Sequence, residues 1–194
     1  MIKKLTPNQI VDEIFDLYIK HGDQDYIGEP VSQLEHMAQT ADLAKKDGYE
    51  DEVVLAAFFH DIGHLCASTN NGDMNGYGAM NHEELGAAFL KERGFSGRLV
   101  FLVKGHVAAK RYLTYKFPEY FNRLSEASRI TLAFQGGIMT KLEAAEFEIN
   151  TDANLMLKMR TWDDLAKITD TPVTNLVELK ELALTHLLGQ KPQY

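Results

Sequence analysis

Residues 53–64 read VVLAAFFHDIGH, and this stretch decides how the chain is interpreted. Its first seven residues, Val53 to Phe59, are all apolar, and such a run predicts a helix that is buried on every side. The polar residues that follow at once, His60 and Asp61, would then lie at the end of a buried helix. Imidazole and carboxylate groups in that position indicate a metal site inside the protein.

Further metal-binding side chains occur before and after this stretch in one fixed order. Any single histidine among them would more often be an ordinary surface or hydrogen-bonded core residue than a ligand. The joint pattern is more informative, because it supplies four imidazoles and two carboxylates, and a carboxylate such as Asp61 can bridge two cations. The sequence therefore predicts a dinuclear metal centre formed by His36, His60, Asp61, His82, His106 and Asp163.

The donor atoms restrict the kind of metal. Cys66 is the only cysteine, so an intrachain disulfide and a thiolate metal cluster are both excluded. A nitrogen and oxygen ligand set suits iron, manganese or zinc. Six ligands leave open positions on two metals, which favours a catalytic role over a structural one.

Length, composition and charge predict a soluble enzyme. A chain of 194 residues can form one domain with a full core. The net charge of −8 argues against nucleic acid or an anionic membrane as a partner. Val53–Phe59, the longest apolar run, is too short to span a bilayer, and residues 1–20 do not resemble a secretory signal. We expect a cytoplasmic location.

The spacing of apolar residues is helical almost throughout and predicts an all-α fold of seven to nine helices. Capping boxes at Thr6 and Thr140, and N-caps at Asn81 and Ser96, mark four helix starts. Residues 67–79 predict a long loop, and only residues 167–173 are compatible with a strand. The predicted helices cover about residues 7–21, 31–46, 51–62 (ending at Gly63), 81–93, 96–112, 124–134, 140–148, 152–161 and 174–188.

Two cationic residues lie within one helical turn of predicted ligands. Lys110 is four residues after His106, and Arg160 is three residues before Asp163, so each shares a helix face with a ligand. The alternative interpretation of each residue is a solvated surface charge. Next to a metal centre, the two side chains would supply donors for a bound dianion.

The order His…His-Asp…His…His…Asp resembles the HD-domain superfamily, and His82 and His106 are the additional ligands of its dinuclear members. Over nearly its whole length the chain is most similar to the PhnZ-type mixed-valence diiron oxygenases, which cleave carbon–phosphorus bonds and are relatives of myo-inositol oxygenase. Generic HD phosphohydrolases share only the metal ligands. The similar segments are residues 26–29 (YIGE), 33–36 (QLEH), 60–64 (HDIGH), 76–78 (GYG), 82–83 (HE), 105–113 (GHVAAKRYL), 127–129 (ASR), 135–137 (QGG) and 160–163 (RTWD).

This resemblance implies a single HD domain over residues 1–194, folded as a helical bundle, with two iron ions in a mixed-valence Fe2+/Fe3+ state. One iron would be held by His36, His60, Asp61 and Asp163. The other would be held by Asp61, His82 and His106, completed by Asp163 or solvent. The residues themselves leave the division of ligands between the irons open.

The resemblance also implies roles for residues around the metals. It assigns catalytic roles and substrate contacts to Tyr26, Glu29 and His64. Tyr26 would occupy an iron position when substrate is absent, Glu29 would pair with the substrate's amine, and His64 would lie beside the ligands. The phosphonate oxygens would be bound by Lys110, Ser128 and Arg160.

The implied activity is a diiron oxygenase that uses O2 to cleave the C–P bond of a 1-hydroxy-2-aminoethylphosphonate, an organophosphonate, and releases phosphate and glycine. One alternative is the TmpB-type reaction, in which the N-trimethylated substrate gives glycine betaine and phosphate. A trimethylammonium cannot donate hydrogen bonds, so its pocket needs room and an anionic or aromatic wall. Either pocket could be formed by Tyr26, Glu29, Met74, Tyr77 and Met80.

A second alternative is a dinuclear metal-dependent HD phosphohydrolase that acts on phosphate esters without O2. Such an enzyme needs the six ligands but has no use for Tyr26 and Glu29, so these two residues favour the oxygenase. A non-catalytic phosphate-binding regulator is disfavoured because no ligand of the set is missing.

Overall fold

The computed structural model of the protein describes residues 5–26, 28–66, 74 and 76–190. This part of the chain is all-α, as predicted, with an isolated bridge between Asp25 and Ser32 and no strand. None of its helices combines the length and hydropathy needed to cross a lipid bilayer. The helices are α1 (Pro7–His21), α2 (Gln33–Lys46), α3 (Asp51–Phe59), α4 (Ile62–Cys66), α5 (His82–Glu92), α6 (Gly97–Lys116), α7 (Pro118–Arg123), α8 (Glu126–Phe134), α9 (Lys141–Glu148), α10 (Ala153–Leu165) and α11 (Leu176–Gly189).

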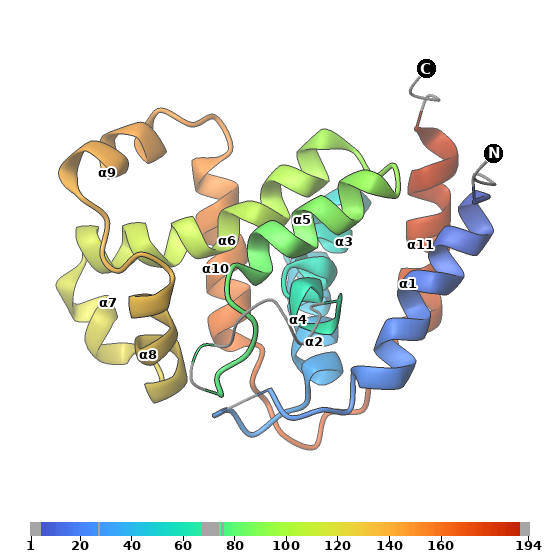
Figure 1. Ribbon diagram of the computed structural model, residues 1–194, viewed down its shortest axis with the longest axis horizontal. Helices are drawn as coiled ribbons and strands as arrows, with labels where there is room; N and C mark the ends of the chain where they lie inside the picture. Colours follow the sequence, from blue (N-terminus) through green and yellow to red (C-terminus); the bar gives the residue numbers. More distant parts are fainter. Residues whose placement is uncertain (1–4, 27, 67–73, 75, 191–194) are drawn as a thin grey trace.

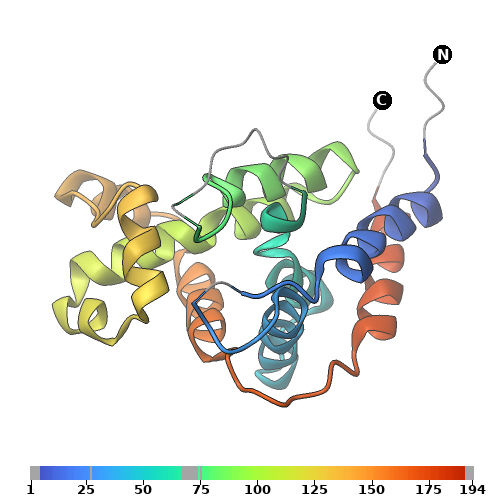
Figure 2. The same ribbon diagram turned by 60° about the horizontal axis from the view of Figure 1, so that its bottom comes forward.

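Helix α3 lies at the centre of the molecule because it is apolar on every side. Each residue from Val53 to Phe59 is at most 3% exposed. Helices α2 and α6 pack against α3, and α10 packs against both α2 and α6. These four helices form the middle of the molecule in Figures 1 and 2. Helices α2, α6 and α10 surround the end of α3, where the His60-Asp61 pair follows.

Two groups of outer helices flank this centre (Figure 1). On one side, α1 and α11 lie side by side, and α11 also contacts α3. On the other side are α7, α8 and α9, of which α7 and α9 contact α6. Helix α5 packs along α6 and contacts α4, so the short α4 is held between the centre and α5.

Most of the predicted helix starts are confirmed. Thr6 and Thr140 each form a complete capping box, and the Ser96 hydroxyl accepts the Leu99 N–H at the start of α6. Asn81 precedes α5 as predicted, but its side chain makes no capping hydrogen bond. Its backbone is left-handed, with a φ of 55°, a conformation that asparagine tolerates better than most residues.

The predicted number of helices was wrong, because the described residues form eleven. Gly63 does not end a helix. The chain turns at His60-Asp61, and Gly63 lies within the separate helix α4. Helix α6 runs on to Lys116 and stops there because Phe117 precedes a proline, which disfavours helical backbone; that proline then begins the unpredicted α7.

Two predictions concern segments outside the helices. Residues 167–173 do not form a strand. Instead, the amide of Gln39 bonds both the N–H and the carbonyl of Ile168, which leaves that backbone unavailable to a neighbouring strand. Of the predicted loop at residues 67–79, residues 67–73 and 75 lie outside the described residues, and the others belong to no helix.

Gly63 lies where α4 approaches α5 closely. A Cβ atom at this position would lie 1.9 Å from the carbonyl oxygen of His82 and 2.6 Å from its carbonyl carbon. Both are backbone atoms and cannot rotate away. The absence of a side chain at Gly63 therefore sets the position of His82, one of the predicted ligands.

We expect Gly63→Ala to lower the free energy of unfolding by about 3 kcal/mol, because α5 must move away from α4 to relieve the overlap. Bound metal should fall in parallel, because His82 moves with α5. Chemical denaturation and metal analysis measure the two effects.

Gly97→Ala is the matched control, since a Cβ there meets nothing within 4 Å. It should leave stability unchanged or slightly raised. Equal stability of the two variants would contradict the proposed close approach.

Candidate metal centre and substrate cavity

All six predicted metal ligands converge on one buried region. They come from five places in the chain: α2, the turn between α3 and α4, the first residue of α5, the middle of α6, and α10. None is more than 3% exposed. They form two groups whose ligand atoms lie within 4.8 Å of one another, namely His36, His60 and Asp163, and Asp61, His82 and His106.

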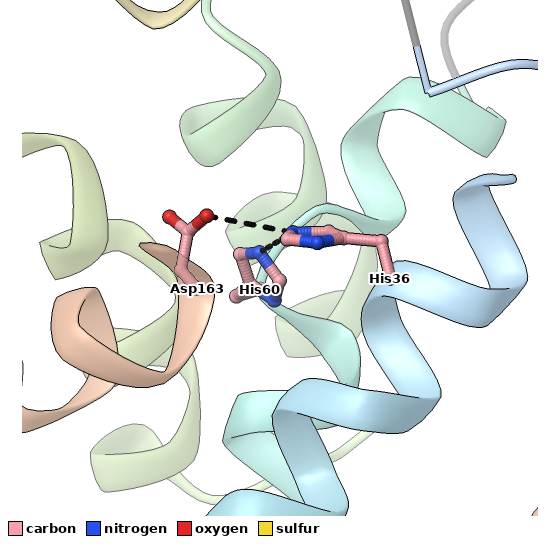
Figure 3. Close-up of side chains that lie close together, drawn as sticks. All are labelled: His36, His60 and Asp163. Carbon is pink, nitrogen blue, oxygen red and sulfur yellow. Dashed lines mark hydrogen bonds and ion pairs between the residues drawn. The ribbon is translucent and has the colours of Figure 1, made fainter. Parts of the chain in front are cut away.

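The first group joins α2, the end of α3 and α10 (Figure 3). The two Nε2 atoms of His36 and His60 are 3.1 Å apart, and an oxygen of Asp163 lies 3.5 Å from His36 Nε2. That oxygen, Oδ1, is buried and has no hydrogen-bond partner. Three donor atoms therefore point at one small volume, as the ligands of a cation do.

The second group has the same character. The Nε2 atoms of His82 and His106 are 3.0 Å apart, and Oδ1 of Asp61 lies 3.2 Å from the first and 3.3 Å from the second. The other oxygen of Asp61, Oδ2, faces the first group, 3.3 Å from His60 Nε2 and 3.7 Å from His36 Nε2. The Asp61 carboxylate thus presents one oxygen to each pair of histidines, which is the arrangement of a bridging ligand.

The outer nitrogens of the rings show that these contacts are suited to metal. The Nδ1 atoms of His36, His60 and His106 lie 2.7–2.9 Å from the carbonyls of Ala166, Ala57 and Val103. A carbonyl can only accept, so each Nδ1 carries the hydrogen and each neutral ring has a lone pair on Nε2. When both rings are neutral, the Nε2 lone pairs of His36 and His60 face each other at 3.1 Å, which is repulsive unless a proton or a metal ion lies between them.

The electrostatics of the first group also favour positive charge. Burial and the neighbouring His60 lower the pKa of His36 to about 4. Burial alone would lower the pKa of His60, but the charges of Asp61 and Asp163 and the hydrogen bonds to Asp61 and Ala57 together outweigh it and raise the pKa to about 9. The carboxylates therefore stabilise one positive charge among these rings. The donor set fits two metal ions held by nitrogen and oxygen, consistent with a dinuclear centre.

Tyr26 and Glu29 lie at the edge of this centre, on the loop before α2. The Tyr26 ring stacks on His36 with a centroid distance of 4.0 Å and an interplanar angle of 12°. Burial and the negative charges of Asp61 and Asp163 raise the pKa of Tyr26. The predicted closeness of Tyr26 to the ligands is therefore present, and Glu29 lines the same cavity as Asp61.

His64 lies next to the second group. Its ring stacks on His82 at 4.1 Å, and its Nδ1 accepts the N–H of Ala79 at 3.2 Å. In the neutral ring, the hydrogen is then on Nε2, which makes His64 a donor. Burial and the neighbouring His82 lower the pKa of His64 to about 3, so the ring is neutral. A Cβ at Gly78 would lie 2.6 Å from this ring, so Gly78 leaves the space that His64 occupies.

Lys110, Ser128 and Arg160 form a cationic corner of the cavity. Lys110 Nζ donates to Thr131 Oγ1 at 3.1 Å, and Arg160 Nη2 donates to Ser128 Oγ at 3.1 Å. Both cations are at most 4% exposed. Among the described residues, no carboxylate oxygen lies within 4 Å of Lys110 Nζ, so this buried ammonium lacks an ionic partner.

Arg160 connects this corner to the metal ligands. Its Nη1 donates to Asp163 Oδ2 at 2.7 Å, and it also pairs with Asp164. Its Nε donates to the hydroxyl of Tyr120 at 2.8 Å. The guanidinium therefore positions a ligand carboxylate while one of its nitrogens faces the predicted anion site at Ser128.

Several residues of the site were not predicted from the sequence. Tyr120 and Asp164 hold Arg160, and Lys167 pairs with Glu29 across 138 positions of the chain. Gln33 and Gln135 both line the cavity, each with a buried, unpartnered amide oxygen. The segments containing the two glutamines did stand out in the sequence, whereas nothing local to Lys167 indicated its distant partner.

One cavity joins all these groups. It is lined by ligands from both histidine groups, by the Tyr26 loop and by the cationic corner; the lining includes Tyr26, Glu29, Asp61, His64, His82, His106, Lys110, Ser128, Arg160, Asp163 and Lys167. Met74 and Tyr77 also line it. A small anion bound at the corner would therefore lie next to both predicted metal positions.

Comparison with known proteins supports this description. The chain is 42% identical over 180 residues to the uncharacterized protein L432 of Acanthamoeba polyphaga mimivirus, covering 92% of this chain and 82% of that protein. It is 41% identical over 169 residues to the [1-hydroxy-2-(trimethylamino)ethyl]phosphonate dioxygenase (glycine-betaine-forming) of Leisingera caerulea, covering 87% and 86%. It is also 41% identical over 179 residues to the hydroxymethylphosphonate dioxygenase of Gimesia maris, covering 89% and 86%.

The HD domain family matches residues 33–170, a range that contains all six predicted ligands and all of α2 to α10. The relatedness to phosphonate dioxygenases extends further, over most of the chain. The chain belongs to the HD domain family and is related to its phosphonate dioxygenases.

Proposed function

We propose that this protein is an iron-dependent oxygenase that cleaves the C–P bond of a 1-hydroxyphosphonate and releases inorganic phosphate. The observation that carries this proposal is the Lys110 ammonium, which is 3% exposed and has no carboxylate within 4 Å among the described residues. A buried cation without a partner is costly, and a bound dianion would compensate it. The activities of the two named relatives support the same class of reaction.

Two iron ions fit the donor set, and His36, His60 and Asp163 would hold one of them. Asp61, His82 and His106 would hold the other, with Asp61 also turned toward the first ion. Bound there, the mixed-valence Fe2+/Fe3+ pair would supply the redox chemistry with O2. The remaining protein groups bind, orient and shield the substrate.

The overall reaction converts a 1-hydroxyphosphonate and O2 into a carboxylic acid and phosphate. The C–H and C–P bonds at C1 break, C1 is oxidised to the carboxyl level, and O2 is reduced. Lys110 and Arg160 neutralise the phosphonate and then the phosphate that leaves, and the hydroxyl of Ser128 adds a hydrogen bond. His64, neutral and with its hydrogen on Nε2, donates to an oxygen of the bound substrate without taking a proton from it.

The chemical group that the substrate carries at C1 is a separate part of the proposal. The leading prediction from sequence was a primary amine, but the relatives' activities favour the trimethylated alternative, since one relative acts on the trimethylamino compound and the other on hydroxymethylphosphonate. Among the described residues that line the cavity, Glu29 is the one carboxylate outside both ligand groups, so it would face a cationic substituent. Tyr26 and Tyr77 supply aromatic walls to the same cavity.

The proposed reaction predicts that phosphate release depends on oxygen. Iron-loaded protein incubated with [1-hydroxy-2-(trimethylamino)ethyl]phosphonate or hydroxymethylphosphonate should release phosphate in air and none under argon, because O2 is the oxidant. Colorimetric phosphate analysis measures this. Release of phosphate from p-nitrophenyl phosphate at the same rate with and without O2 would instead identify a phosphohydrolase and refute the oxygenase.

Tyr26→Phe and Glu29→Gln should each lower kcat/KM for the trimethylamino substrate by at least about tenfold, because each removes a polar group at the substrate cavity. Neither change removes an imidazole or carboxylate of the two ligand groups, so bound iron should stay near the wild-type amount. Steady-state kinetics and elemental analysis test both statements.

Tyr49→Phe, at a ring that packs on Trp162 instead of lining the cavity, is the control and should behave as wild type. Wholesale loss of iron from both Tyr26→Phe and Glu29→Gln would show that these residues maintain the metal centre instead of contacting substrate.

The affinity for phosphonate should also depend on the charge of Lys110. Burial and the nearby positive charge of Arg160 lower the pKa of Lys110 to about 7. The lysine is therefore cationic below that pH and loses its charge as the pH rises through it. Phosphonate affinity should fall above pH 7, by up to about tenfold per pH unit for one coupled proton.

Lys110→Arg keeps the cation at every accessible pH and should flatten this fall, while the ionisation of the phosphonate itself is common to both proteins. Calorimetric titrations between pH 6 and pH 9 compare the two. Identical pH profiles for wild type and Lys110→Arg would show that Lys110 does not titrate at the anion site.

A further inference from the structure

Glu29 is not a free carboxylate, because Lys167 pairs with it inside the substrate cavity. Lys167 Nζ donates to Glu29 Oε1 at 2.6 Å. The side chains are only 18% and 9% exposed, and both line the cavity that contains Asp61, Lys110 and Arg160. Any cationic group that approaches Glu29 must therefore compete with an ammonium that the protein itself provides.

The backbone that carries Lys167 is fixed on both sides. The carbonyl of Ala166 accepts the Nδ1 hydrogen of His36 at 2.9 Å. The next residue, Ile168, is bonded through both its N–H and its carbonyl to the side chain of Gln39, at 3.0 Å and 2.9 Å. The main chain at residues 166–168 is thus anchored to α2, and the flexible part of Lys167 is its four-carbon side chain.

Lys167 also lies where two hollows meet. It lines the substrate cavity, and it lines a separate groove between α6, α7 and α10 whose wall includes Tyr120 and the carboxylates of Glu119 and Asp164. Rotation of the Lys167 side chain toward this groove would therefore move the ammonium from Glu29 toward Glu119, since Asp164 already accepts hydrogen bonds from Arg160 and Tyr120. Such a movement requires no change in the metal ligands.

We propose that Lys167 is a specificity-determining residue that sets the preference between cationic and uncharged hydroxyphosphonates. In the free protein, the ammonium of Lys167 is ion-paired with the carboxylate of Glu29. A substrate with an amine or trimethylammonium group binds only by displacing that ammonium, whereas hydroxymethylphosphonate binds with the Glu29–Lys167 pair intact. This inference rests on the proposed function, since it concerns the substrate of that same cavity.

The two kinds of cationic substrate meet this competition differently. A primary ammonium can replace the hydrogen bond that Glu29 loses, while a trimethylammonium offers charge but no donor. Ion pairs with this degree of exposure contribute modestly. We therefore expect Lys167 to shift selectivity by a moderate factor and not to act as an absolute barrier.

Lys167→Met removes the ammonium and retains the length of the side chain. The test measures dissociation constants under argon, by calorimetry on iron-loaded protein, for [1-hydroxy-2-(trimethylamino)ethyl]phosphonate and for hydroxymethylphosphonate. The ratio of the two constants should move in favour of the cationic compound by about threefold to tenfold relative to wild type. Lys167→Arg, which keeps the cation, should stay near the wild-type ratio.

Two controls test whether the effect comes from the Glu29–Lys167 ion pair. Lys180→Met removes one positive charge from an exposed ion pair, in which Lys180 Nζ lies 2.7 Å from Asp12 and neither residue lines the cavity, and it should not change the ratio. In a Glu29→Gln background, Lys167→Met should no longer change the ratio of the two dissociation constants in favour of the cationic compound. The reason is that the Glu29 carboxylate, for which Lys167 and the substrate compete, is absent.

The outcomes separate this inference from the proposed function. If phosphate is released in air but Lys167→Met leaves the ratio unchanged or shifts it toward the uncharged compound, the role of Lys167 is wrong and the oxygenase stands. If the ratio shifts as expected but neither compound releases phosphate with O2, the oxygenase is wrong and the selectivity role stands. If wild-type protein binds neither compound, both are wrong.

Discussion

The carboxylate of Asp61 is the group on which the rest of the site depends. It is 2% exposed, and its two oxygens face different pairs of histidines. A carboxylate this deeply buried is tolerated only where positive charge and hydrogen-bond donors surround it. The apolar character of α3 follows from the same requirement, because the helix that precedes Asp61 must reach the centre of the molecule. The surrounding helices each bring one side chain to that point.

Groups of both charges line the cavity. Imidazoles and carboxylates of the two ligand groups share its wall with the cations Lys110 and Arg160. Arg160 connects the two, since it bonds Asp163 and Ser128 with different nitrogens of one guanidinium. An anion bound near Ser128 would therefore act, through Arg160, on a carboxylate that also belongs to a candidate metal group. Lysine could not replace this arginine, because a single ammonium lacks the planar fork that spans both partners.

The sequence predicted the all-α fold because helices depend on local and strongly periodic features. The six side chains are distant from one another in the chain, and they were predicted as ligands because they occur in one fixed order around a His-Asp pair that follows an apolar run. Helix starts at Thr6, Ser96 and Thr140 follow from capping residues that act within three positions. The short α4 and α7 were missed, since five or six residues are too few to show a helical period. The Glu29–Lys167 ion pair and the hydrogen bond between Arg160 and Tyr120 were missed for a different reason. Their partners are distant in the chain, so only the packing of whole helices brings them together.

The anchoring of residues 166–168 has a consequence for how relatives of this protein can diverge. One short segment orients His36 through the Ala166 carbonyl, is tied to Gln39 at Ile168, and carries a side chain into the cavity between those two bonds. An insertion or deletion here would shift the register of all three at once and would disturb a ligand together with the cavity wall. A substitution at position 167 would leave both of these bonds in place, whereas a change in the length of the chain around it would not.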